Sequence, residues 1–63
     1  MEDFQERVMV EKLQLDDRLK RLEEFIESKV FPTLTPAEQE RLMHQSHLME
    51  GYSNILGERI ENF

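Results

Sequence analysis

Three side chains in the second half of this 63-residue chain have a spacing that could bring metal ligands together. Glu40, His44 and His47 lie at positions i, i+4 and i+7, so a helix would place them on one face. A protein zinc site normally has three or four ligands drawn from more than one segment, and the chain contains no cysteine to complete the set. We therefore predict that the chain holds no metal and no other cofactor.

Nucleophilic catalysis needs a hydroxyl, a base and an orienting acid within hydrogen-bond reach of one another, in a pocket that excludes water. Ser28, Ser46 and Ser53 supply hydroxyls, and two histidines supply bases. Their positions on two long helices give neither this arrangement nor a cleft. We predict that the protein is not an enzyme.

Aromatic, arginine and amide side chains form a more informative group. Tyr52 offers a flat ring with a hydroxyl, Phe31 lies at a predicted loop, and Arg41 leaves the first turns of the second predicted helix. Rings, guanidinium groups and amides are the groups that bind a nucleotide base and its phosphate. Taken alone, Tyr52 and Phe31 fit plain hydrophobic packing better than ligand binding.

Gln45 and Arg59 are polar residues at positions of an apolar stripe where leucine would pack better. Such residues commonly set the register between helices or pair with a carboxylate, which for Arg59 could be Glu11. The alternative is that they contact a ligand. The sequence leaves both interpretations open.

The elements that position these groups are two amphipathic helices. Apolar residues at steps of three, four or seven predict a first helix over about 4–29. The run Thr35-Pro36-Ala37-Glu38 combines a capping hydroxyl, a proline at the first helical position and a Glu three residues after the cap. It predicts a second helix over about 36–62, after a loop over about 30–35. The second apolar stripe consists of Leu42, Gln45, Met49, Tyr52, Leu56, Arg59 and Phe63.

These helices predict an all-α fold, a single antiparallel two-helix hairpin over residues 1–63. The predicted neighbours are Leu15 with Tyr52, Val8 with Arg59, and Phe4 with Phe63. The apolar residues predicted outside this seam are Met9, Leu13, Phe25, Met43, Leu48 and Ile55. A chain this short has too small a core to be stable alone without disulfides, a metal or self-association. The surplus apolar surface therefore predicts a helical homo-oligomer.

Charge and hydropathy limit the partners and the location. Fourteen acidic and eight basic residues give a net charge of −6, and the basic residues form no block in the sequence. This balance disfavours polymeric nucleic acid and anionic membranes. The longest strictly apolar run, Val8-Met9-Val10, is far below the ~20 residues that span a bilayer, and no signal peptide pattern is present. We expect the chain to stay in the cytoplasm.

Two segments of the sequence resemble a known family. They are Glu6-Arg7-Val8-x-x-Glu11-x-x-x-Leu15-x-x-x-Leu19 and Phe31-x-x-Leu34-Thr35-x-x-Glu38-Gln39-x-Arg41-Leu42-x-x-Gln45-x-x-x-Met49-x-x-Tyr52-x-x-x-Leu56-x-x-Arg59-Ile60. The pattern is similar to the small helical-hairpin proteins of bacteriophages related to the anti-CBASS and anti-Thoeris nucleotide sponges. The likeness covers nearly the whole chain.

The resemblance implies a hexamer of hairpins in the host cytoplasm that binds cyclic di- or trinucleotides between protomers and withholds them from immune effectors. It implies that Phe31 stacks on a base, that Arg41 and Arg59 bind phosphate, and that Gln45 and Tyr52 hydrogen-bond base or sugar. The resembling proteins have a phosphate-binding lysine one turn into the second helix, where this chain has Gln45 and Ser46. The competing hypothesis is a structural or protein-binding hairpin with no small-molecule ligand, whose exposed Met and Phe side chains dock on another polypeptide.

Overall fold

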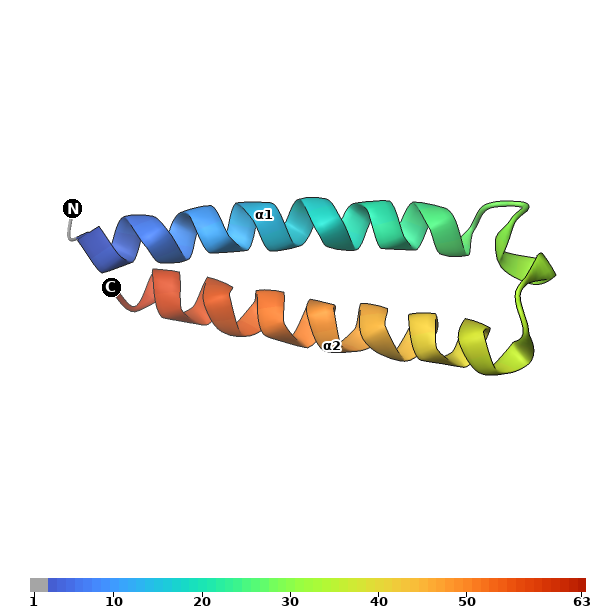
Figure 1. The fold of residues 1–63 in the computed structure, drawn as a ribbon. Helices are drawn as coiled ribbons and strands as arrows, with labels where there is room; N and C mark the ends of the chain where they lie inside the picture. Colours follow the sequence, from blue (N-terminus) through green and yellow to red (C-terminus); the bar gives the residue numbers. More distant parts are fainter. Residues whose placement is uncertain (1–2) are drawn as a thin grey trace.

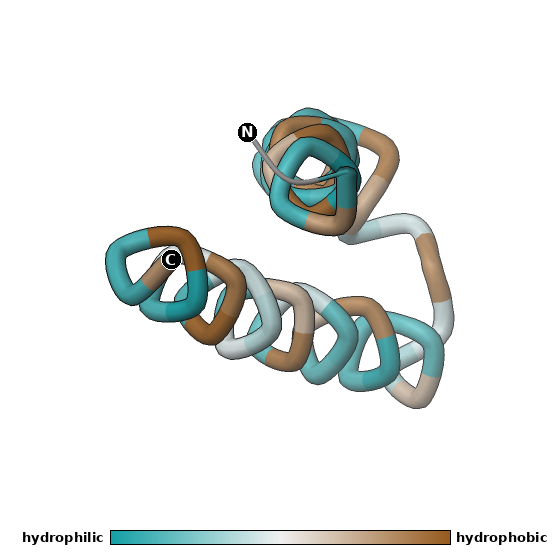
Figure 2. Tube along the Cα trace, turned by 90° about the vertical axis from the view of Figure 1, so that its left-hand side faces the viewer, coloured by the Kyte–Doolittle hydropathy of each residue, from teal (hydrophilic) through white to brown (hydrophobic). Residues whose placement is uncertain are grey.

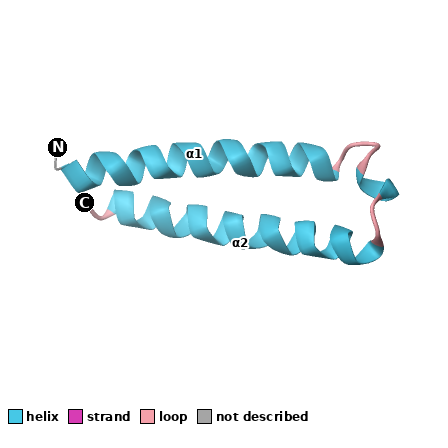
Figure 3. Cartoon of the chain, in the orientation of Figure 1, coloured by secondary structure: helices cyan, strands magenta, loops and turns pink. Residues whose placement is uncertain are grey.

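Two long helices lie side by side and antiparallel (Figures 1 and 3). The structure is a computed structural model that describes residues 3–63. Helix α1 covers Asp3–Ile26, a short 3-10 helix η1 covers Phe31–Thr33, and helix α2 covers Pro36–Glu61. The molecule measures 46 × 15 × 13 Å. The predicted all-α fold of two helices packed against each other is confirmed.

Helix α1 ends earlier than predicted, at Ile26 and not near Lys29. The serine at position 28 explains the difference. Its hydroxyl donates to the carbonyl oxygen of Phe25 at 2.6 Å and accepts from the backbone N–H of Val30 at 3.3 Å. Serine side chains that bond to nearby backbone in this way compete with helical hydrogen bonds and favour turns.

Helix α2 begins as the sequence predicts. The Thr35 hydroxyl accepts from the backbone N–H of Glu38 at 3.2 Å, and Pro36 occupies the first helical position. The helix ends at Glu61, one residue before its predicted end. The predicted loop contains the 3-10 turn η1, which directs the chain from one helix to the other.

The core between the helices is small. Val8 and Leu15 of α1 are buried against Leu56 of α2, which is fully buried, and Met49 and Ile60 pack against this cluster. At the open end of the hairpin the rings of Phe4 and Phe63 meet edge to face, with centroids 5.7 Å apart. The predicted proximity of Phe4 to Phe63 is therefore confirmed.

The predicted seam of α2 is wrong at three positions. Gln45, Tyr52 and Arg59 are exposed, so Tyr52 and Arg59 do not take the buried seam positions predicted for them opposite Leu15 and Val8. The following residue takes the inward position in each case, and these residues are Ser46, Ser53 and Ile60. Leu42, Met49 and Leu56 keep the inward positions predicted for them, so the actual seam is rotated by about 50°, half of one residue step, from the predicted one.

A polar contact explains why a serine is buried at the centre of the hairpin. Lys12 donates from Nζ to Ser53 Oγ at 2.8 Å and to Asp16 Oδ2 at 3.0 Å, and the Ser53 hydroxyl donates to Asp16 Oδ1. Each polar atom of Ser53 therefore has a partner, which removes most of the cost of burying it. The small serine also leaves room for the lysine side chain between the helices.

Asp16 makes the stability of this contact dependent on pH. Hydrogen bonds from Ser53 and Lys12 favour the carboxylate and hold the pKa of Asp16 below its ordinary value. A lowered folded-state pKa stabilises the fold above the unfolded-state value of about 4, and this contribution disappears as pH falls through the folded-state value.

We expect Asp16→Asn to lower the free energy of unfolding at pH 7 by less than about 1 kcal/mol, because the side chain is partly exposed. Urea unfolding at a series of pH values from 7 down to about 2.5 measures the effect, which should shrink as pH falls below about 4, because the lowered pKa of Asp16 stabilises the fold only while the unfolded-state carboxyl is ionised. Asp17→Asn is the matched control, since the Asp17 ion pair with Arg21 lies on the surface. Equal losses in both variants would contradict a special role for the central contact.

The hairpin exposes more apolar surface than a small monomer usually does. Its accessible surface is 5037 Å², against about 4,300 Å² expected for a folded monomer of 7.6 kDa. Hydrophobic segments lie on the outer sides of both helices as well as between them (Figure 2). All six residues predicted to lie outside the seam are exposed: Met9, Leu13, Phe25, Met43, Leu48 and Ile55. Neither described helix is long and apolar enough to cross a membrane.

Candidate functional site

The five predicted site residues lie on two elements. Phe31 is half-buried at the start of η1, and the other four are exposed on α2. Arg41 Nε donates to Glu38 Oε1 at 2.9 Å, and the Gln45 amide lies 3.8 Å from the sulfur of Met49. Tyr52 is 46% exposed. Arg59 makes no ion pair within residues 3–63.

These residues do not converge within one hairpin. Arg41 and Arg59 are separated by 18 residues of continuous helix, which corresponds to about 27 Å. A single small ligand cannot contact both ends of that stretch. The four helical residues do share one side of α2, because they follow the same steps of three and four, with Leu48 and Ile55 completing the stripe.

A hollow between the helices lies on the side of the hairpin opposite to the one that carries the predicted ligand residues. It is lined by Glu23 and Glu27 from the end of the first helical segment and by Met43 and His47 of α2, above the seam residues Ile26 and Ser46. These outer residues follow the seam residues by one position, so the side that carries them lies about 100° from the seam in the same sense on each helix. We call it the acidic side. Its charged residues and histidine are Glu6, Asp16, Lys20, Glu23, Glu27, Glu40, His47, Glu50 and Glu61, and its large apolar residues are Met9, Leu13 and Met43.

The residues that precede the seam positions form the other broad side, which we call the arginine side. From α1 it carries Arg7, Glu11, Gln14, Arg18, Arg21 and Phe25, and from α2 it carries Glu38, Arg41, Gln45, Leu48, Tyr52, Ile55 and Arg59. All five arginines of the sequence lie there. The basic residues form no block in the sequence, but helical geometry gathers residues that are distant along the chain.

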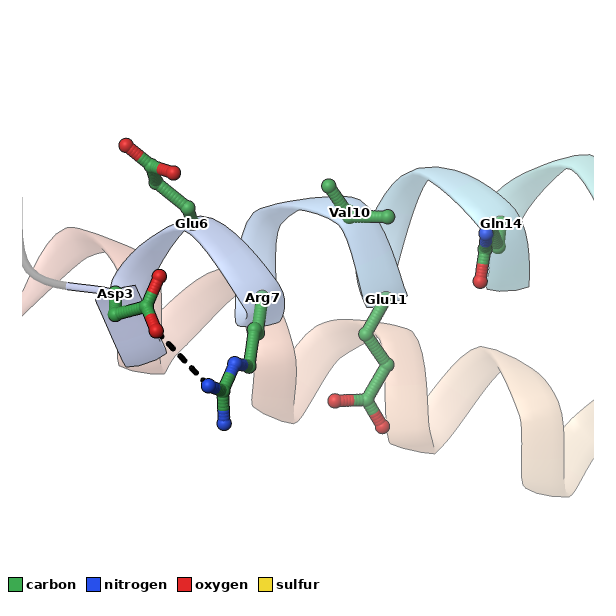
Figure 4. Close-up of a pocket in the computed structure, with 6 residues that line it drawn as sticks. All are labelled: Asp3, Glu6, Arg7, Val10, Glu11 and Gln14. Carbon is green, nitrogen blue, oxygen red and sulfur yellow. Dashed lines mark hydrogen bonds and ion pairs between the residues drawn. The ribbon is translucent and has the colours of Figure 1, made fainter.

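A second hollow lies near the N-terminal end of α1 and is lined by that helix alone (Figure 4). Arg7 and Glu11 project from α1 in the same direction, whereas Glu6 and Val10 point away from them. Arg7 donates to Asp3 at 2.9 Å. Because a single helix supplies every lining residue, this hollow is a shallow depression that cannot enclose a ligand within one hairpin.

The histidines and serines that could bind a metal or act in catalysis are either exposed or bonded between the helices. Glu40, His44 and His47 are exposed, and no three His, Asp or Glu side chains among the described residues are arranged to hold a metal ion. The buried serine, Ser53, bonds to Lys12 and Asp16 and not to a histidine. Ser53 is 6% exposed and bonds to two residues of α1, so it contributes to helix packing.

Arg18 and Arg21 were not among the predicted site residues. Both lie on the arginine side, and Arg18 makes no ion pair within the described part of the chain. A helical projection of the sequence could have revealed them, because each arginine of α1 falls at a fixed angle from the apolar stripe. The predicted ligand contacts came from the loop and the second helix, so no residue of the first helix was among them.

Comparisons with known proteins support the resemblance to the nucleotide-sponge family. The family model described as Sequestin matches residues 2–62. No curated protein and no solved structure matches the chain. The match covers both helices and the turn between them, and it confirms the predicted relationship to the nucleotide-sponge proteins. The chain belongs to the Sequestin family.

Proposed function

We propose that this protein sequesters cyclic di- or trinucleotides without changing them chemically, at junctions between copies of the hairpin. In a phage-infected host cytoplasm this would withhold the signal from anti-phage immune effectors. Membership in the Sequestin family is the observation that carries the proposal. Sequestration requires binding groups and no catalyst. This suits a hairpin in which the side chains of Ser53, Lys12 and Asp16 bond to one another between the helices.

Self-association is part of the proposal. Eleven large hydrophobic side chains of the described residues are at least 37% exposed, whereas three form the buried core. Burying such surface against further copies supplies the stability that a small core lacks. A hexamer is the assembly that the resemblance implies, and it would bring the arginine side of one hairpin close to another copy.

The contacts proposed for the ligand are the five predicted residues. Phe31 would stack on a base, Arg41 and Arg59 would bind phosphate, and Gln45 and Tyr52 would bond to base or sugar. Their spread along α2 supports a site that is shared between copies, because residues about 27 Å apart in one hairpin can contribute to different ligands or to different ends of an assembly.

Isothermal calorimetry with a panel of adenine and guanine cyclic di- and trinucleotides tests the proposal. We expect binding by at least one member and recovery of the intact nucleotide after the protein is denatured. Light scattering at the same concentration should give the mass of an oligomer. Absence of heat with every nucleotide would contradict the proposal and favour the structural or protein-binding hairpin. Recovery of a cleaved nucleotide would show that the protein is an enzyme.

A further inference from the structure

The arginine side has a charge opposite to that of the whole chain. It carries five arginines and two carboxylates, Glu11 and Glu38, and the carboxylates of Asp3 and Asp17 reach two of these arginines, which still leaves an excess of positive charge in a protein of net charge −6. The acidic side carries Glu23 and Glu27 at the hollow between the helices, and these carboxylates repel phosphate. An anionic ligand is therefore attracted to the arginine side and away from the hollow.

The five arginines differ in whether a carboxylate of the same chain forms an ion pair with them. Arg7 pairs with Asp3 at 2.9 Å, Arg21 with Asp17 at 2.8 Å, and Arg41 with Glu38 at 2.9 Å. A phosphate that binds one of these three must compete with a carboxylate of the same helix. Within residues 3–63, Arg18 and Arg59 make no ion pair, so both guanidinium groups are available without such competition.

The antiparallel register separates the two available arginines. Asp16 contacts Ser53, and Phe4 contacts Phe63, so positions on the two helices that add to about 67–69 lie at the same height. Arg59 therefore lies within about one turn of Glu11, whose carboxylate faces the same side. Arg18 lies at the height of Tyr52, which adds a ring and a hydroxyl but no negative charge.

Further along the arginine side, toward the loop, Phe25 of α1 lies at the height of Gln45 of α2 by the same register. Arg18 and Phe25 are seven residues apart, which is about 10 Å along the helix. A guanidinium group and a phenol ring are thus followed at the next level by a second ring and an amide. This sequence of groups suits a ligand in which phosphates alternate with flat bases.

We infer that Arg18 binds a phosphate of the sequestered nucleotide, with Tyr52 and Gln45 beside it and Phe25 as a second stacking ring. The inference rests on the proposed function and deepens it. It moves the principal phosphate contact from Arg41, which has a carboxylate partner, to a guanidinium group of α1 that has none. It also makes α1 a ligand-binding helix and not only a support for α2.

Calorimetry on Arg18→Gln tests the inference, using the cyclic nucleotide that wild-type protein binds most tightly. We expect Kd to rise about tenfold or more, since a charge-assisted hydrogen bond is lost. Lys20→Gln is the matched control because it removes one positive charge from the same helix, on the acidic side. It should leave Kd within about twofold. Arg18→Lys should recover part of the affinity, because it keeps the charge but loses the two-pronged geometry.

The possible results separate this inference from the proposed function. Wild-type binding with equal Kd values for Arg18→Gln and Lys20→Gln would overturn the role of Arg18 and leave sequestration standing. No binding by wild-type protein would overturn both. Light scattering provides a further readout: a change of oligomer mass in Arg18→Gln would identify Arg18 as a contact between copies and overturn its assignment as a phosphate ligand.

Discussion

Leu56→Ala is expected to unfold most of the protein at 25 °C. Leu56 is fully buried and touches the cluster formed by Val8 and Leu15 of the other helix. Truncating a buried leucine to alanine costs about 2–5 kcal/mol, through lost burial and the cavity that remains. A chain of this size has a core contribution of about 3–5 kcal/mol. Loss of one residue at the centre of a three-residue core therefore removes most of the stability.

Circular dichroism with urea unfolding, at a fixed protein concentration, measures this effect. The concentration must be fixed because self-association would stabilise the folded chain by mass action. Leu13→Ala is the matched control, since Leu13 is 70% exposed in the same hairpin. Leu56→Met should cost less than about 1.5 kcal/mol because volume and polarity are kept. Equal stability of Leu56→Ala and Leu13→Ala would show that the seam is not where the structure places it.

The seam also shows how far the sequence determined the fold. The helix pair, the cap at Thr35 and the exposed apolar residues followed from local patterns, because capping chemistry and helical periodicity are short-range properties. The face of α2 that packs against α1 did not follow from these local patterns. Two stripes with identical spacing run side by side on this helix, one through Gln45, Tyr52 and Arg59 and the other through Ser46, Ser53 and Ile60.

Hydrophobicity favoured the wrong stripe because tyrosine is more apolar than serine. The structure buries Ser53 because Lys12 and Asp16 of the facing helix satisfy its hydroxyl. That compensation is a property of two residues 37 and 41 positions away, and no local pattern in α2 reports it. The same rotation moved the predicted ligand residues Gln45, Tyr52 and Arg59 from the interior to the arginine side, where they can meet a ligand or another copy.

The exposed apolar residues of the arginine side are expected to hold copies of the hairpin together. Leu48 is 63% exposed and Ile55 is 53% exposed, and Tyr52 lies between them on the arginine side. If copies of the hairpin cover this stripe, as the proposed function requires, the double variant Leu48→Glu, Ile55→Glu would place two carboxylates in an apolar contact. Burying an unpaired charge costs several kcal/mol, so the oligomer should dissociate.

Sedimentation equilibrium at micromolar concentration should then report a single-chain mass of about 7.6 kDa for the double variant and a multiple of it for wild-type protein. His44→Glu, Gly51→Glu is the matched control, because it adds two carboxylates with the same spacing on the same helix. Those positions are exposed on the outward face of α2, and a side chain at Gly51 would meet open space. The control should keep the wild-type mass, because neither substitution places a carboxylate on the arginine side and an exposed helix gains stability when glycine is replaced. Wild-type protein that sediments as a folded single chain would remove the basis for sites between copies. Dissociation of both variants would show that the contact is not confined to the arginine side of α2.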